Sequence, residues 1–175
     1  MFLRRFIGAL VLDASIYEDI EADRSRGLQS LLVVAMAAAG GGVGVVGLGL
    51  TGPAGFLAGA VIVLGAWLVW IIAISVVGTI ALPEPQTRSG AGELMRTVGF
   101  AMAPGVLLAF AAMRPAALPV FVIVAVWILA AMVLAMRQAL DYRSTARAIA
   151  VCVVSWLVAA GLVAAVAAML TQRVS

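Results

Sequence analysis

The chain has 175 residues, of which 65% are hydrophobic and only 11% are charged, and its mean hydropathy is +1.20. A soluble domain carries roughly a quarter charged residues and about half apolar ones, so this composition excludes a soluble globular protein. The net charge of +3 comes from eleven arginines and eight acids, without lysine or histidine; in a membrane protein such arginines are topological signals, and no nucleic-acid partner is expected.

The N-terminus has the pattern of an amphipathic helix. Its apolar side chains recur at helical spacing, with Arg4, Arg5 and Gly8 between them: Phe2, Leu3, Phe6, Ile7, Leu10 and Val11. Such a helix lies either on the membrane surface or on the protein's own cytoplasmic face, and both alternatives stay open. We reject a signal peptide because Asp13 ends the short apolar run without a small-residue cleavage site.

Residues 13–26 are polar and carry four neighbouring acids, Glu18, Asp19, Glu21 and Asp23. A calcium loop starting at Asp19 fails on spacing, because Arg24 stands where the loop needs glycine and Ser30 where it needs glutamate. We expect a solvated helix with charge pairs. Residues 1–26 are therefore predicted to form a cytoplasmic N-terminal segment.

A run of 57 residues without charge, 27–83, follows this segment. As one helix it would be roughly 85 Å long, nearly three bilayer cores, so the chain must turn back within it. Thr51-Gly52-Pro53 is the expected turn, because glycine and proline together break a helix. The first two predicted spans are 28–50 and 54–82, and a polar loop follows at 83–90.

Arginines frame three further apolar stretches, 97–113, 115–136 and 148–172. The first is short for a spanning helix and contains Pro104-Gly105, which we expect to kink it or make it re-entrant. A five-span chain with its N-terminus inside places nine arginines on the cytoplasmic side and two, Arg114 and Arg173, outside. This bias favours five spans over four.

The predicted fold is therefore an all-α, polytopic membrane bundle of about five transmembrane helices with a short N-terminal amphipathic helix, residues 27–175 forming the membrane domain. We expect it in a bacterial cytoplasmic membrane, with the N-terminus inside and the C-terminus outside.

Glycine spacing offers two interpretations of the first spans. Residues 42–47 match G-x-G-x-x-G, but no strand precedes them and no acid follows about 20 residues on, so a dinucleotide site is rejected. The pairs Gly40/Gly44 and Gly55/Gly59 instead predict smooth faces for close helix packing. Packing within one chain is favoured over a dimer interface, which stays open.

Little in the sequence can support catalysis. Without histidine no catalytic triad can form, and Cys152 is alone, so we expect no enzyme activity, no metal site and no cofactor. The polar groups within the spans, Ser75, Thr79 and Ser155, are expected to bond to backbone carbonyls. Charges lie at span ends, where Glu93 could pair with Arg96 and Arg137 with Asp141.

Four stretches, taken in order, resemble the prokaryotic branch of the Yip-domain family of five-span membrane proteins. They are LVLDASIYE at 10–18, the uncharged double span, VGFAMAP at 98–104 and MRQALDYRSTARA at 136–148. The third resembles the family's Gly-aromatic-Ala-x-x-Pro pattern, and the fourth its cytoplasmic turn between the last two helices. The resemblance implies a five-span topology. Eukaryotic relatives have a long N-terminal region and bind Rab-type GTPases, which we do not expect here with about 26 residues before the first predicted span.

Two functions follow as hypotheses. The first is a non-enzymatic interaction or scaffold subunit that contacts lipids and binds other integral membrane proteins or itself, through its glycine faces and through a cytoplasmic face of Tyr17, Arg137, Asp141 and Arg143. The second is a small carrier or channel for an apolar or weakly polar solute, with its binding level at Pro104-Gly105. The absence of charges within the spans favours the first.

Overall fold

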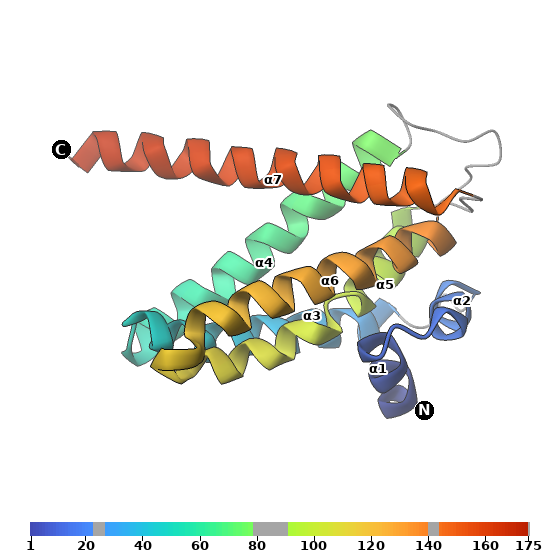
Figure 1. Ribbon diagram of the computed structural model, residues 1–175, viewed down its shortest axis with the longest axis horizontal. Coiled ribbons are helices and arrows are strands. Elements are labelled where there is room, and N and C mark those ends of the chain that lie inside the picture. Colours follow the sequence, from blue (N-terminus) through green and yellow to red (C-terminus); the bar gives the residue numbers. More distant parts are fainter. Residues whose placement is uncertain (23–26, 79–90, 140–143, 175) are drawn as a thin grey trace.

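The computed structural model is all-helical over the residues that it describes (Figure 1), which are 1–22, 27–78, 91–139 and 144–174, with the backbone alone for 91, 93, 159–160 and 162–174. The seven α-helices of this part are α1 (Phe2–Leu10), α2 (Ala14–Ala22), α3 (Gly27–Gly44), α4 (Gly52–Val76), α5 (Ala91–Phe100), α6 (Ala117–Ala139) and α7 (Thr145–Val174). Three 3₁₀ helices join them, η2 (Val45–Leu48), η4 (Ala103–Ala112) and η5 (Arg114–Ala116). The predicted all-α fold is confirmed.

Four helical segments are long and apolar enough to cross a membrane: Gly27–Leu48, Gly52–Val76, Leu94–Ala112 and Arg114–Ala139. They correspond to the first four predicted spans, and their length and composition indicate an integral membrane protein. The predicted fifth span falls within α7, of which Thr145–Val158 forms a shorter apolar helix. The fifth crossing stays a prediction, and residues 79–82 of the second span and the loop 83–90 lie outside the described residues.

The connection between α1 and α2 is a sharp turn. Leu12 has a φ of +63°, in the left-handed region that side chains other than glycine rarely adopt. The Asp13 carboxylate then accepts hydrogen bonds from the backbone N–H and the hydroxyl of Ser15, at 3.0 and 2.7 Å. Asp13 therefore caps the start of α2, and the turn folds α2 back beside α1.

The predicted turn between the first two spans is present. Gly49 and Gly52 have φ values of +93° and +74°, which explains why glycine stands at both positions. Pro53 follows in the first turn of α4, where its missing N–H leaves no helical hydrogen bond unmade. The chain thereby reverses direction between η2 and α4.

The third spanning segment changes its helix type in the middle. Its α-helical part ends at Phe100, and η4 begins at Ala103, with Pro104 in its first turn. Because proline lacks an N–H and its ring clashes with the preceding turn, an unbroken α-helix is not available here. The change from α-helix to 3₁₀ helix falls at the proline singled out in the sequence.

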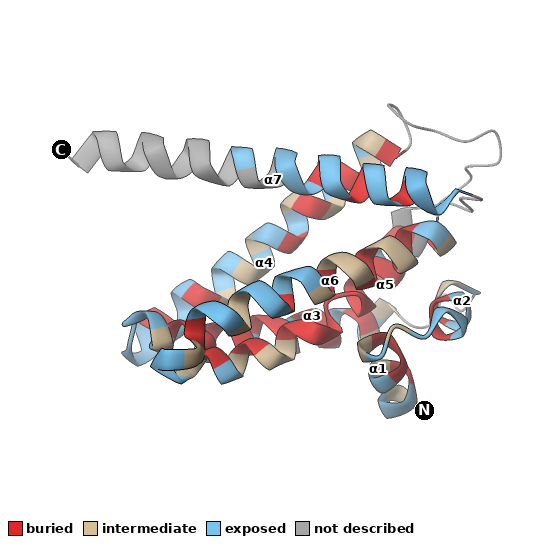
Figure 2. Cartoon of the chain, viewed as in Figure 1, coloured by how far each residue is buried: buried red, intermediate tan, exposed pale blue. Residues whose placement is uncertain are grey.

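The segment Leu94–Ala112 forms the centre of the bundle. In this segment 72% of the most apolar window is buried, against 28% in α4 and in α6. Helix α3 packs against η4, α5 and α4, while α6 covers η4 on another side. Helix α4 leaves α3 after their shared turn, and α7 contacts α4 and α6 (Figures 1 and 2). Much of α4 and α6 is therefore left to face the membrane.

Candidate functional site at the polar end of the bundle

Most described polar side chains gather at one end of the bundle. We call this the polar end; it consists of α1, α2, the first turns of α3, α5 and α7 and the last turn of α6 (Figure 1). Five arginines with described side chains belong to elements of this end, and one lies at the opposite end, on η5: Arg4, Arg5, Arg96, Arg137 and Arg147, against Arg114.

Arg5 joins three helices of the polar end. Its Nε donates a hydrogen bond of 2.9 Å to Asp19 Oδ2 on α2, and its Nη1 donates one of 3.3 Å to Gln29 Oε1 on α3. The arginine is buried whereas Asp19 is exposed to water, so the ion pair is screened on one side. Its main effect is to fix α1 against α2 and the start of α3.

Helix α1 has two different apolar faces. On the inner face the Phe2 ring lies 6.4 Å from the ring of Phe100 and 6.1 Å from that of Phe6. On the outer face Leu3 and Ile7 are exposed, as is Val11 directly after the helix. Figure 1 shows α1 directed across the long helices rather than along them. The helix therefore packs on the protein with one face and presents the other outward. Packing on the protein and lying on the membrane surface, the two alternatives left open by the sequence, are thus compatible with each other.

Tyr17 does not lie on the predicted cytoplasmic interaction face, which is a correction to that prediction. Its side chain is fully buried and its hydroxyl donates a hydrogen bond of 3.3 Å to the Ala9 carbonyl oxygen. Burial raises the pKa of this hydroxyl above its ordinary value. Tyr17 is therefore a core residue between α1 and α2, and α2 is solvated on one side only, because Ile16 and Ile20 are buried with it.

The remaining residues of that predicted face divide into two groups. Arg137 is exposed in the last turn of α6 and next to Gln138, whose amide donates a hydrogen bond of 3.2 Å to Glu18 Oε1. Asp141 and Arg143 lie outside the described residues, as does the predicted pairing of Arg137 with Asp141. Among the four residues, Arg137 alone is therefore placed on the surface by the described part of the chain.

Arg96 is a buried charged residue beside a small pocket. It is 7% exposed, and its Nη2 donates a hydrogen bond of 2.8 Å to the Glu21 carbonyl oxygen at the end of α2. Its Nε is buried and has no hydrogen-bond partner among the described residues. The side chain of Glu93, the partner that the sequence predicted for Arg96, lies outside them.

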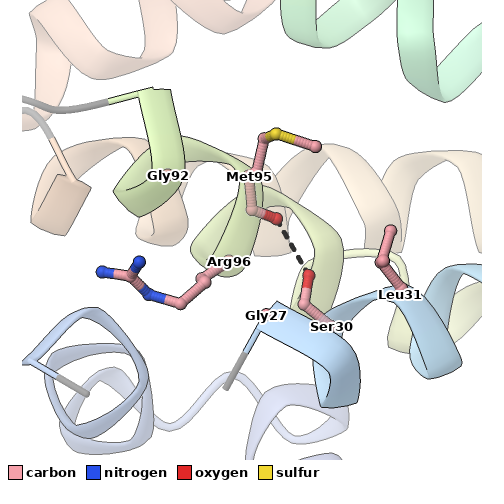
Figure 3. Close-up of a pocket in the computed structure, with 6 residues that line it drawn as sticks. All are labelled: Gly27, Ser30, Leu31, Gly92, Met95 and Arg96. Atoms are coloured by element: carbon pink, nitrogen blue, oxygen red, sulfur yellow. Dashed lines mark hydrogen bonds between the residues drawn. The ribbon is translucent and has the colours of Figure 1, made fainter. Parts of the chain in front are cut away.

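The pocket beside Arg96 lies where α3 and α5 begin (Figure 3). It has a volume of about 180 Å³ and is lined by Gly27, Ser30, Leu31, Gly92, Met95 and Arg96. Ser30 Oγ on α3 donates a hydrogen bond of 2.9 Å to the Met95 carbonyl on α5, which holds the two helices together. This pocket was not predicted from the sequence, although an arginine at the start of an apolar span was a signal available for it.

The glycines predicted to pack helices lie at close contacts within the chain. A β-carbon on Gly40 would come within 2.6 Å of the Gly105 carbonyl oxygen, and one on Gly59 within 2.7 Å of the Gly41 carbonyl oxygen. Gly44 lies against Leu108, and a β-carbon on Gly55 would come within 2.7 Å of the Leu50 backbone. These positions therefore serve α3, η4 and α4 themselves, and their faces are not open to a partner.

The G-x-G-x-x-G stretch is also part of this packing. Gly42 lies against Phe56, Gly44 against Leu108 and Gly47 against Ala111. The stretch lies on α3 and η2, between membrane-spanning helices. Its glycines are in contact with protein backbone and side chains. In a nucleotide site these glycines would instead lie against a phosphate.

Polar groups on the apolar helices show two kinds of environment. Ser75 Oγ donates a hydrogen bond of 2.8 Å to the Ile71 carbonyl, the role expected for it, while Thr79 lies outside the described residues. By contrast, Trp67 Nε1, Trp70 Nε1 and Ser155 Oγ are buried without a partner in the described part of the chain. Both tryptophans lie on α4 and Ser155 on α7, two helices in contact.

Within the described residues no group of three or more acids, cysteines or histidines could hold a metal ion. Comparisons with protein-family models, curated proteins and solved structures found no match. The resemblance to the Yip-domain family therefore stays a prediction.

Proposed function

We propose that this protein is a non-enzymatic membrane subunit that binds other integral membrane proteins, or a second copy of itself, through one face of α4. This surface, called here the outer face of α4, lies opposite the residues of α4 that are buried. It consists of Ala54, Ala58, Val61, Gly65, Leu68 and Ile72. All of these residues except Gly65, which is half-buried, are exposed.

The outer face of α4 carries the small residues Ala54, Ala58 and Gly65 beside the larger Val61, Leu68 and Ile72, and the described residues leave it uncovered. A β-carbon on Gly65 would have no heavy atom within 4 Å, in contrast to one on Gly40 or Gly59. Ala54, Ala58 and Gly65 recur at spacings of four and seven, so they share a face and let another helix approach closely. These small residues, left open by the part of the chain that the structure describes, are the observation that carries the proposal.

Helix α6 offers a weaker surface although it is equally exposed. Its outward positions carry large side chains, among them Leu118, Val122, Ile123 and Val126, which are suited to lipid. Helices in a membrane associate through close packing rather than through the hydrophobic effect, because lipid tails are as apolar as the helices. The large side chains therefore assign the outward side of α6 to lipid, whereas the small residues of α4 favour a protein partner there.

We place the polar end in the cytoplasm. The five described arginines at this end against one at the other support that orientation, because positively charged loops are retained inside. The resemblance to Yip-domain proteins supports the same orientation and a fifth span in α7. Under this proposal Arg137 lies on the cytoplasmic surface and the C-terminus outside.

The test is purification of the tagged full chain from native membranes in a mild detergent, followed by mass spectrometry of what co-purifies. Two variants carry the same change, Ala58→Leu on the outer face of α4 and Ala125→Leu on the exposed side of α6. We expect a stoichiometric membrane protein with the wild type and with Ala125→Leu, and its loss from Ala58→Leu. A protein recovered alone, or a partner indifferent to both changes, contradicts the proposal.

A second candidate function, a small carrier for a weakly polar solute, is favoured by the unpartnered donors on α4 and α7. Buried N–H and O–H groups without partners are costly in an apolar environment, and a solute with an acceptor oxygen would satisfy them. Trp70→Phe keeps an aromatic ring and removes the donor. Loss of solute uptake with an intact fold would favour the carrier, and unchanged uptake would exclude this site.

A further inference from the structure

We propose that the outer face of α1 lies among the acyl chains of the membrane leaflet at the polar end, and that Arg4 beside this face binds the phosphate groups of anionic lipids. The outer face consists of Leu3 and Ile7, with Val11 directly after the helix. Its partner is a lipid surface, in contrast to the protein partner of α4. This inference does not depend on the outer face of α4, nor on the side of the membrane to which the polar end belongs.

Both ends of α1 are held well inside the bundle. The Phe2 ring lies 6.4 Å from that of Phe100, which is about 14 Å along the axis of α5 from its first residue. The Leu10 carbonyl accepts its 2.8 Å bond from Trp127, which is about 18 Å along the axis of α6 from the last residue, Ala139. These two distances are similar, and Figure 1 shows α1 directed across the long helices. Helix α1 therefore crosses the bundle close to the plane of the membrane.

Helix α2 lies nearer the polar end than α1 does. It contacts α5, which begins at this end, and the last turn of α6, where Gln138 bonds to Glu18. Helix α1 instead contacts η4, the inner part of the third spanning segment. An amphipathic helix at a membrane surface lies about 5–10 Å into the boundary between headgroups and acyl chains. The arrangement therefore corresponds to a solvated helix, α2, above an interfacial one, α1.

The two sides of α1 point in opposite directions along the bundle. Arg5 bonds to Asp19 of α2 and to Gln29 in the first turn of α3, so its side of α1 is turned toward the polar end. Leu3 and Ile7 are each two residues from Arg5, which corresponds to about 160° around the axis of an α-helix. The outer face of α1 is therefore turned away from the polar end, toward the interior of the membrane.

Lipid fits this face better than another helix does. Leu3, Ile7 and Val11 are large, whereas close packing of helices in a membrane favours small residues. All three side chains are exposed, so the described part of the chain leaves them uncovered. Acyl chains adapt to such a surface without a complementary partner. The large apolar side chains and their direction therefore favour lipid as the occupant.

Arg4 lies at the border of the outer face. It is exposed and three residues before Ile7, so its aliphatic part can lie along the apolar face while the guanidinium reaches the headgroups. Arg5 is paired with Asp19, and α1 itself contains no acid to pair with Arg4. A guanidinium matches the geometry of a phosphate, and attraction to anionic lipids adds to the burial of apolar area. The charge and the apolar face therefore favour the same partner, an anionic lipid surface.

The first experiment measures the depth of the outer face in the full chain, reconstituted in vesicles of phosphatidylcholine and phosphatidylglycerol. In a Cys152→Ser background a nitroxide is attached at Ile7→Cys or, as the matched control, at Glu18→Cys on an exposed position of α2. We expect the label at 7 to be relaxed more by oxygen, which partitions into lipid, than by a water-soluble nickel chelate, and the label at 18 to show the reverse.

Two results of this measurement would overturn the lipid contact. Equal access of the nickel chelate to both labels would show that the outer face of α1 meets water. A label at 7 that is shielded from both reagents, or coupled magnetically to a second label, would identify a protein partner or a second copy instead.

The second experiment tests Arg4 with phosphatidylglycerol and phosphatidylcholine that carry the same photoreactive group in an acyl chain. Crosslinks within residues 2–11 are mapped by mass spectrometry. We expect about fivefold more of them from phosphatidylglycerol, the contribution of one arginine near an anionic surface. Arg4→Gln should lose this preference, and Arg137→Gln, the same change on α6, should keep it. Equal yields from both lipids in the wild type, or the same loss in both variants, would overturn the role of Arg4.

Discussion

Trp127 Nε1 donates a hydrogen bond of 2.8 Å to the carbonyl oxygen of Leu10, 117 residues earlier in the chain. Leu10 is the last residue of α1, where backbone carbonyls have no partner within the helix. The indole of α6 therefore satisfies the end of α1 and holds it against the membrane domain. This contact makes the N-terminal segment part of the folded bundle.

Replacing Trp127 by phenylalanine should release α1. Phenylalanine keeps an aromatic ring but lacks the indole N–H donor. We therefore expect the free energy of unfolding to fall by about 1 kcal/mol, the usual contribution of one hydrogen bond. Amide hydrogen exchange should accelerate in residues 2–10. Trp156→Phe, at an exposed position of α7, is the control. Equal exchange in both variants would contradict the proposed role of the indole.

Two glycine substitutions should have opposite effects. In Gly40→Ala the new β-carbon would lie 2.6 Å from the Gly105 carbonyl and 2.9 Å from that of Val106, so backbone must move, at a cost of about 1–3 kcal/mol. Gly65→Ala meets open space and gains about 0.5–1 kcal/mol from helix propensity. Thermal unfolding in detergent measures both; similar shifts would contradict the assigned packing.

The sequence was informative where local chemistry decides the structure. Gly52 and Pro53 identified the turn before α4, because glycine adopts a positive φ without strain and proline lacks the N–H that a helix interior needs. The apolar spacing after Met1 likewise predicted α1. Periodicity does not say whether a face meets protein or lipid, however, and α1 turned out to present both kinds of surface.

Tertiary contacts decided what the sequence could not. Tyr17 has an apolar ring and a polar hydroxyl, so its exposure depended on whether a carbonyl, here that of Ala9, lay within reach. The pairs Gly40/Gly44 and Gly55/Gly59 are equally suited to packing within or between chains, and only the folded arrangement assigns them to the chain itself. The pocket at Arg96 depends on two helix starts brought together from distant parts of the sequence.

The burial of Tyr17 predicts a loss of stability at high pH. Its folded-state pKa lies above the ordinary value of 10.0, so the unfolded chain loses this proton first as the pH rises. The stabilisation is fully present below about pH 10 and decreases above it. Tyr142→Phe leaves Tyr17 as the sole tyrosine. Ultraviolet absorbance should then show no tyrosinate near pH 10 in the folded protein, and an ordinary titration there would contradict the burial.

The orientation can be tested with single cysteines in a Cys152→Ser background. Met113→Cys, at the end of the bundle away from the polar end, should react with a membrane-impermeant maleimide on intact spheroplasts, and Ser144→Cys, before α7, should not. A reporter fused after Ser175 should be active outside. The reverse labelling, or a cytoplasmic reporter, would show that the predicted orientation or the fifth span is wrong.

Contact between the outer face of α4 and another membrane protein is the central claim, and photocrosslinking in living cells measures it most directly. A photoreactive amino acid is placed at Ala58, and in the control at Ala125 on α6. We predict a discrete crosslinked band at position 58, to a membrane protein or a second copy, and none at position 125. Lipid-only products at both positions, or the same bands at both, would contradict the claim.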